Sequence, residues 1–139
     1  MNLRDAILKR RSVRHFQTTD VPDLAEIIAL ARRAPSAGAL RAYETILTKE
    51  KISRIDAPMY MVICANPQAY SVRYGERGRD LYSIQDATIF GAYFQLLLVD
   101  MGLSSVWIGA FREGRIKSVL KIAEHLKPVA IIAIGYERT

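Results

Sequence analysis

The chain has 139 residues, of which half are apolar and 24% are charged, a balance typical of one soluble globular domain. Twenty basic and fourteen acidic side chains leave a net charge of +6, and residues 1–16 contribute five basic side chains against one acidic. This composition excludes a largely disordered chain. It indicates an anionic partner such as a small phosphate, an acidic lipid or a nucleic acid.

Other classes of protein are excluded by single features. Cys64 is the only cysteine, so no disulfide can form within the chain and nothing indicates secretion. Charged residues recur from Arg4 onward, ahead of any uninterrupted apolar run, which is unlike a signal peptide. The most apolar segment, residues 87–99, would span only about 20 Å as a helix, too short for a bilayer. We therefore predict a cytoplasmic protein with no membrane contact and no metal site.

The first third of the chain predicts two helices and a strand. Asn2 is a suitable N-cap for a helix that carries apolar residues at positions 3, 7 and 8 and runs into an arginine cluster. Apolar residues at helical spacing predict a second helix from Asp23 to about Ala34. The segment Pro35-Ser36-Ala37-Gly38 ends it, and a strand is predicted over Tyr43–Thr48.

The middle of the chain predicts a buried strand, a loop and a long helix. Met59–Ala65 is apolar enough to be buried on both faces, which makes Cys64 part of the core rather than a reactive thiol. Asn66–Asp80 contains one proline, two glycines and three arginines and is predicted to be an exposed loop. A helix over about Asp80–Met101 is apolar nearly all round, which places it at the centre of the protein, and Gly102 ends it.

The last third predicts two strands around one helix. The strands are Ser104–Ile108 and Val129–Ile134, and apolar residues at positions 116, 119, 120 and 123 mark one face of the helix. No repeat, low-complexity tract or linker divides the chain. The prediction is a single α+β domain over residues 1–139, with a small central mixed sheet packed by helices around a buried central helix.

The basic cluster Arg10-Arg11-Ser12 suits a phosphate group. Guanidinium groups present forked donors that match phosphate oxygens, and a serine hydroxyl adds a further donor. A solvated basic helix end, favoured by the helix dipole, explains the same residues. Spacing alone does not decide between these interpretations.

Two further segments suggest close approach of the backbone to a ligand. Pro35-Ser36-Ala37-Gly38 would present N–H groups with little side-chain cover, or would simply terminate a helix. The segment Trp107-Ile108-Gly109 would let a ligand approach the backbone closely at Gly109, or it would be a core strand that ends in a turn. Neither a Ser/His/Asp arrangement nor a carboxylate pair is evident. A reaction carried by a bound cofactor needs little such side-chain machinery.

Taken in order, these segments resemble the nitroreductase family of flavin enzymes. The blocks that carry the resemblance are Arg10–Phe16, Ala34–Gly38, Asp86, Gly102–Phe111 and Lys127–Tyr136. They cover nearly the whole chain in the family's order. The resemblance implies a nitroreductase-like fold, non-covalently bound FMN, and a homodimer with both flavin sites at the subunit interface.

The resemblance also implies roles for individual residues. Arg10, Arg11 and Ser12 would grip the flavin phosphate and ribityl chain, and Arg14 would reach the pyrimidine side of the ring. Pro35–Gly38 would come from the other subunit, and Trp107-Ile108-Gly109 would bring a backbone N–H toward flavin N5. Three departures stand out: Ala39 replaces the family's asparagine, the chain ends soon after Tyr136 with Arg138 as a substitute basic group, and the region between the two halves is short.

The implied function is an FMN-dependent oxidoreductase. It would take hydride from NADH or NADPH and pass it to a small acceptor, such as a nitro compound, a quinone or free flavin, by a ping-pong mechanism. One alternative is a protein that stores or senses FMN without efficient turnover, consistent with the missing asparagine. The other, less favoured, is a basic nucleic-acid-binding module, against which the scattered aromatic residues argue.

Overall fold

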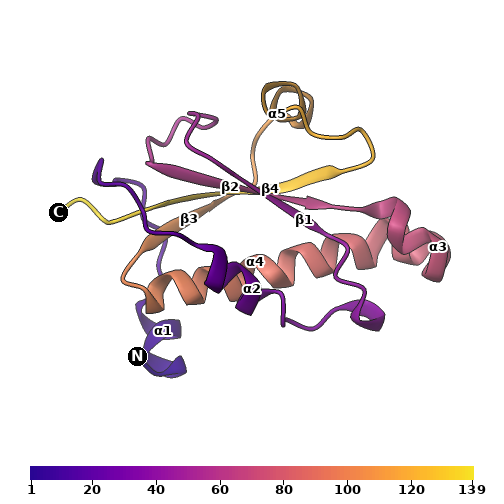
Figure 1. Cartoon of the computed structure of the whole chain (residues 1–139), viewed down its shortest axis with the longest axis horizontal. Helices are drawn as coiled ribbons and strands as arrows, with labels where there is room; N and C mark the ends of the chain where they lie inside the picture. The colour runs from indigo at the N-terminus through magenta and orange to yellow at the C-terminus, as the bar shows by residue number, and fades with distance from the viewer.

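A computed structural model describes residues 1–139. Its four strands form one sheet, and Figure 1 shows helices on both faces of this sheet. The helix α4 (Ser83–Asp100) lies across one face together with α1 (Leu3–Lys9) and α2 (Ala25–Ala31), whereas α5 (Glu113–Leu120) covers the other face. The remaining elements are the turn η1 (Ala37–Ala39), β1 (Glu44–Thr48), β2 (Met59–Ala65), α3 (Pro67–Arg77), the π-helical turn η2 (Gly78–Tyr82), β3 (Ser104–Ile108) and β4 (Lys127–Gly135).

The sheet has the strand order β1-β2-β4-β3, and every pair of neighbouring strands is antiparallel. The prediction of a mixed sheet is therefore wrong, and the only parallel contact is a single bridge between Ser12 and Ser105. The strands β2 and β4 are almost wholly buried, as predicted for β2. Their continuous apolar character arises because helices cover both faces of an antiparallel sheet, and parallel pairing is not needed for it.

The helix α4 forms the core on its face of the sheet. Phe90, Phe94 and Leu98 are fully buried among the apolar side chains of β2 and β4. Gly91 permits a close approach, because a Cβ atom there would lie 2.4 Å from the ring of Trp107. In a single chain α4 is not buried all round, since Tyr93 is 43% exposed.

Helix boundaries follow local chemistry at several points. The side chain of Asn2 accepts a hydrogen bond from the backbone N–H of Asp5 at 2.9 Å, which confirms the predicted N-cap of α1. Gly102 follows α4 with a φ of +79°, which confirms it as the residue that ends the helix. The helix α2 begins later and ends earlier than predicted. The helix α5 stops before Ala123, because Lys121 adopts a φ of +54°.

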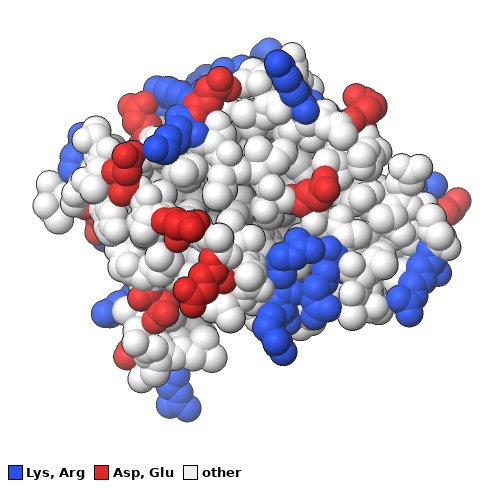
Figure 2. Space-filling model, viewed as in Figure 1, with Lys and Arg blue, Asp and Glu red and all other residues white.

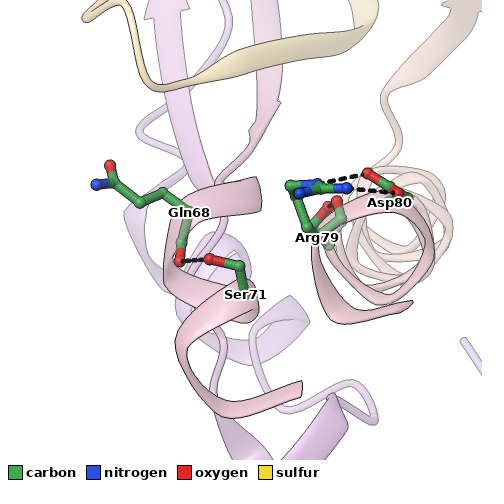
Figure 3. A network of polar contacts seen from close by, with 5 residues as sticks. Gln68, Ser71, Arg79 and Asp80 are labelled. Carbon is green, nitrogen blue, oxygen red and sulfur yellow. Dashed lines mark hydrogen bonds and ion pairs between the residues drawn. The ribbon is translucent and has the colours of Figure 1, made fainter. Parts of the chain in front are cut away.

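Residues 67–80 are helical, so the prediction of an exposed loop over Asn66–Asp80 is wrong. Asn66 caps α3, since its side chain accepts from the backbone N–H of Ala69, and the next residue is a proline in the first turn. Gly75 places a kink in α3 with a φ of +62°. In Figure 3, the hydroxyl of Ser71 donates to the carbonyl of Gln68, and an ion pair joins the neighbouring residues 79 and 80 in η2.

A second core cluster fills the α5 side of the sheet. Cys64 belongs to it and is fully buried, and burial raises the pKa of its thiol to about 11. This confirms its prediction as a core residue, because the reactive form of a thiol is the thiolate. No helix is both long enough and apolar enough to span a membrane.

Candidate functional site

The N-terminal and C-terminal segments meet beside β3 and form a basic pocket of about 230 Å³. Its lining consists of Arg11, Ser12, Val13, Arg14, His15, Glu137 and Arg138. The N–H of Val13 donates to the carbonyl of Ser105 at 3.0 Å, and the N–H of Arg138 donates to the carbonyl of His15 at 3.0 Å. Segments far apart in the sequence are thus joined by backbone hydrogen bonds.

The extended backbone around Val13 explains why the side chains of Ser12 and Arg14 face outward. Val13 and Phe16 are buried in the core on the α5 side, whereas Ser12, Arg14 and His15 are exposed. Neighbouring side chains of an extended strand point to opposite faces, so burial of Val13 directs Ser12 and Arg14 to the solvent side.

The pocket carries positive charge, part of which an acidic side chain neutralises. Arg11 forms an ion pair with Glu137, whereas the guanidinium groups of Arg14 and Arg138 have no ion-pair or hydrogen-bond partner in the chain. Arg10, which the sequence analysis grouped with Arg11, is the exposed C-cap of α1 and does not line the pocket. No pattern in the sequence points to Glu137, which lies just beyond β4 and reaches Arg11 only through the tertiary fold.

The segment Pro35–Gly38 is held at a different place by a buried carboxylate. Asp86, in the first turn of α4, is 4% exposed and accepts hydrogen bonds from the Ser36 hydroxyl at 2.5 Å and the Ala37 N–H at 3.0 Å. The Tyr70 hydroxyl donates to the same carboxylate oxygen at 2.5 Å. Burial and the neighbouring carboxylate raise the pKa of Tyr70 to about 12, so it remains a donor at neutral pH.

Further hydrogen bonds hold the backbone of the Pro35–Gly38 segment in place. The Ser36 hydroxyl also accepts from the backbone N–H of Arg41 at 2.9 Å, and Arg73 donates to the carbonyl of Gly38 at 3.1 Å. In the sequence, Asp86 is one of the blocks that resemble the family, but its contact with Ser36 is not predicted there. The 50-residue separation between the two gives no local signal.

The basic pocket and the Pro35–Gly38 segment lie at opposite ends of α4 in one chain. Asp86 is in the first turn of α4, whereas Arg11 lies near Val99, in its last turn, where both line a small pocket. Thirteen residues of helix separate Asp86 from Val99, or about 20 Å at 1.5 Å per residue. One protomer therefore does not bring the predicted site residues together.

The end of β3 leads from the basic pocket to an open stretch of backbone. Ser12 pairs with Ser105, and Gly109 follows four residues later, about 13 Å away at roughly 3.3 Å per residue. Gly109 is exposed, and a Cβ atom added to it would meet no protein atom within 4 Å. Its φ is not positive, so backbone conformation does not require a glycine there. Trp107 is half-buried against Gly91 and anchors this end of the strand.

Together these features define an α+β protein with a basic pocket beside an edge strand. The model of the nitroreductase family matches residues 7–55 and 54–136. The chain belongs to the nitroreductase family, which confirms the resemblance found in the sequence.

Individual relatives cover almost the whole chain. A Methanothermobacter thermautotrophicus protein, whose assigned name refers to NADH dehydrogenase and NAD(P)H nitroreductase activities, is 27% identical over 98% of this chain and 78% of its own length. A nitroreductase family protein from Clostridium novyi NT is 28% identical, with a TM-score of 0.88 over 99% of this chain and 86% of that chain. An FMN-dependent nitroreductase from Clostridium difficile R20291 is 27% identical, with a TM-score of 0.80 over 96% of this chain and 87% of that chain.

Proposed function

We propose that this protein is an FMN-dependent oxidoreductase that uses NAD(P)H. The observation that carries the proposal is the pocket formed by Arg11, Ser12, Arg14 and Arg138, placed at one end of the strand that leads to Gly109. The donor set fits the phosphate of a flavin nucleotide, because guanidinium groups and a hydroxyl bind phosphate oxygens. The names of the M. thermautotrophicus and C. difficile relatives support the same cofactor pair.

The chain's own residues then have distinct roles. Arg11, Ser12 and Arg138 bind the phosphate end, and Arg14 supplies positive charge toward the pyrimidine side of the ring. Gly109 leaves room for the ring to approach the backbone of the Trp107-Ile108-Gly109 turn. The chemistry supplied by bound FMN is acceptance of hydride from NAD(P)H and reduction of a small acceptor, such as a nitro compound, a quinone or free flavin, in ping-pong order.

An absorption spectrum and an anaerobic titration test this function. We expect purified, FMN-saturated protein to show a flavin band that is bleached by one equivalent of NADH or NADPH per site. A yellow protein that neither nucleotide bleaches would instead support FMN storage or sensing, for which Ala39 and the Arg11–Glu137 ion pair are the favouring observations. Steady-state rates with varied acceptor that intersect instead of running parallel would contradict the ping-pong order.

A nucleic-acid module is the least favoured function. On the face shown in Figure 2, basic and acidic side chains both occur, and the largest group of basic atoms is confined to one part of it. Binding to DNA or RNA that falls steeply with salt, by colourless protein, would support that alternative.

A homodimer is part of the proposal, because it would complete the site. Large apolar side chains stay exposed on α4 and on the two helices that pack with it, namely Tyr93 on α4, Leu3, Ile7 and Leu8 on α1, and Leu30 on α2. Burying this face against a second copy by a two-fold axis would place Pro35–Gly38 of one chain toward the basic pocket of the other, which one chain alone does not do.

Sedimentation velocity measures this expectation. The FMN-saturated protein should sediment at twice the 15.7 kDa mass of the chain, and Leu8→Glu should shift it to the monomer and weaken FMN binding. Leu8 is 83% exposed, so the substitution does not disturb the core of a single chain. Val72→Glu is the matched control, because Val72 is 87% exposed on α3 and should leave the dimer intact. A wild-type monomer in FMN-saturating buffer would rule the dimer out.

Substituting Gly109 tests the position of the flavin ring. Because nothing in the protein lies near a side chain at this position, Gly109→Val should fold with wild-type stability. We expect at least about ten-fold weaker FMN binding or slower flavin reduction, since the side chain would occupy the space assigned to the ring. The exposed Gly114, which also has open space around it, gives a control in Gly114→Val. Wild-type affinity and reduction rate in Gly109→Val would refute the assignment.

A further inference from the structure

A groove of about 720 Å³ opens on the α5 side of the sheet. It is enclosed by the segment between β1 and β2, the end of β3, the start of α5 and one residue of β4. Ile52, Ile116 and Ile131 are buried and provide an apolar floor. The groove shares no lining residue with the basic pocket that contains Arg11, and it shares only Ile108 with the residues assigned to the flavin.

Three guanidinium groups surround this apolar floor. Arg54, Arg112 and Arg115 line the groove, are exposed, and form no ion pair or side-chain hydrogen bond within the chain. No acidic residue lines the groove. The acidic residues next to these arginines are already paired, since Asp56 contacts Lys51 at 2.6 Å and Glu113 contacts Lys127 at 2.6 Å. The groove therefore combines apolar surface with uncompensated positive charge.

We propose that this groove binds a small amphipathic anion, a molecule with one carboxylate or sulfonate group on an aliphatic or aromatic body. The apolar part would cover the isoleucine floor, and the anionic group would be bound by the arginines at the rim. The volume lies within the range of about 300–1,000 Å³ that small-molecule sites occupy. The uncompensated guanidinium groups favour an anionic ligand over a second copy of the chain, because two copies meeting at this groove about a two-fold axis would bring the same positive charges together.

The groove borders the flavin site of the proposed function at Ile108 and Ala110, on either side of Gly109, whereas its other nine lining residues lie outside that site. Arg54 and Ile55, which line it, are the residues at which the two matched segments of the nitroreductase family model meet. The groove is thus built around a point where this chain departs from the continuous family pattern. The inference goes beyond the proposed function and does not rest on it.

Isothermal titration calorimetry with octanoate tests the proposal on the full chain, with and without saturating FMN. We expect saturable binding of one octanoate per chain in both conditions. Octanol, which has the same chain length but no charge, should bind at least about ten-fold more weakly because it lacks the charge-assisted contacts. Raising the salt concentration should weaken octanoate and leave octanol nearly unchanged.

Charge-neutralising variants locate the site. Arg112→Gln/Arg115→Gln should weaken octanoate about ten-fold and leave octanol unchanged. Arg4→Gln/Arg77→Gln removes the same net charge at exposed positions outside the groove and should have no effect.

The absence of saturable octanoate binding, equal affinity for octanoate and octanol, or an unaffected Arg112→Gln/Arg115→Gln variant would overturn the proposal. A change in sedimentation coefficient of that variant without loss of octanoate binding would identify a contact between copies instead. Because the measurement is also made without FMN, a failed flavin assignment leaves it interpretable.

Discussion

Replacing Asp86 with alanine is expected to lower the free energy of unfolding by about 3–5 kcal/mol. The buried carboxylate accepts three hydrogen bonds, from Ser36, Ala37 and Tyr70, and each bond to a charged group contributes roughly 1.5–3 kcal/mol without full additivity. Its removal also leaves the fully buried Tyr70 hydroxyl without an acceptor. Urea denaturation followed by circular dichroism measures the change.

Two variants separate this effect from a general sensitivity of α4. Asp100→Ala, at the other end of the same helix, removes an exposed carboxylate whose only ion pair is with the chain's N-terminus at 3.7 Å, and should cost less than about 0.5 kcal/mol. Asp86→Asn keeps one acceptor oxygen and should remain folded. If Asp86 positions Pro35–Gly38 for a flavin, Asp86→Asn should weaken FMN binding several-fold even when folded. An Asp86→Ala variant within 1 kcal/mol of wild type would disprove the role of this carboxylate.

Arg11→Ala is expected to weaken FMN by roughly one to two decades and riboflavin hardly at all. One charge-assisted contact to phosphate contributes about 1.5–3 kcal/mol, and riboflavin lacks the phosphate. Titration of both flavins into apo wild type and apo Arg11→Ala, with circular dichroism to check the fold, measures the difference. Equal losses for the two flavins would show that Arg11 supports the ring or the fold instead.

Two neighbouring substitutions refine this test. Glu137→Gln should strengthen FMN several-fold, because the Glu137 carboxylate competes with phosphate for the guanidinium of Arg11. Arg10→Ala should have less effect than Arg11→Ala, because Arg10 does not line the pocket. A larger loss for Arg10→Ala would restore the role that the sequence resemblance implied for Arg10. No FMN loss in either arginine variant would mean that the cluster is a solvated basic helix end.

Several features were predictable from the sequence because local interactions determine them. The strands Met59–Ala65 and Ser104–Ile108 have the predicted boundaries. Met59–Ala65 is an apolar run between Pro58 and Asn66, and Ser104–Ile108 lies between two glycines, Gly102 and Gly109. Asn2 and Gly102 mark helix ends through contacts or backbone angles within a few residues. The order of family blocks was likewise a property of the linear chain, and it was sufficient to identify the family.

Other features were decided only when distant segments came together. Gly75 and Gly78 are the two glycines that favour a loop over Asn66–Asp80 in the sequence. In the structure, Gly75 places a kink within α3, and Gly78 lets η2 pack closely against Tyr70, where a Cβ atom would lie 2.5 Å from the carbonyl oxygen. The antiparallel pairing of β2 with β4 joins residues some 70 positions apart. The apolar sequence of a strand does not indicate whether its partner runs parallel or antiparallel to it.

The candidate site also combines features that the sequence indicates with features that only the tertiary structure decides. The residue types for binding phosphate were visible in the sequence, because guanidinium and hydroxyl groups have the same chemistry in any fold. Only the tertiary structure showed that Arg138 joins Arg11 while Arg10 does not, that Glu137 neutralises Arg11, and that α4 keeps Pro35–Gly38 at its other end. The physical reason is that these contacts depend on which strands and helices pack together, and packing is set by burial over the whole chain, whereas sequence patterns report only the few residues on either side.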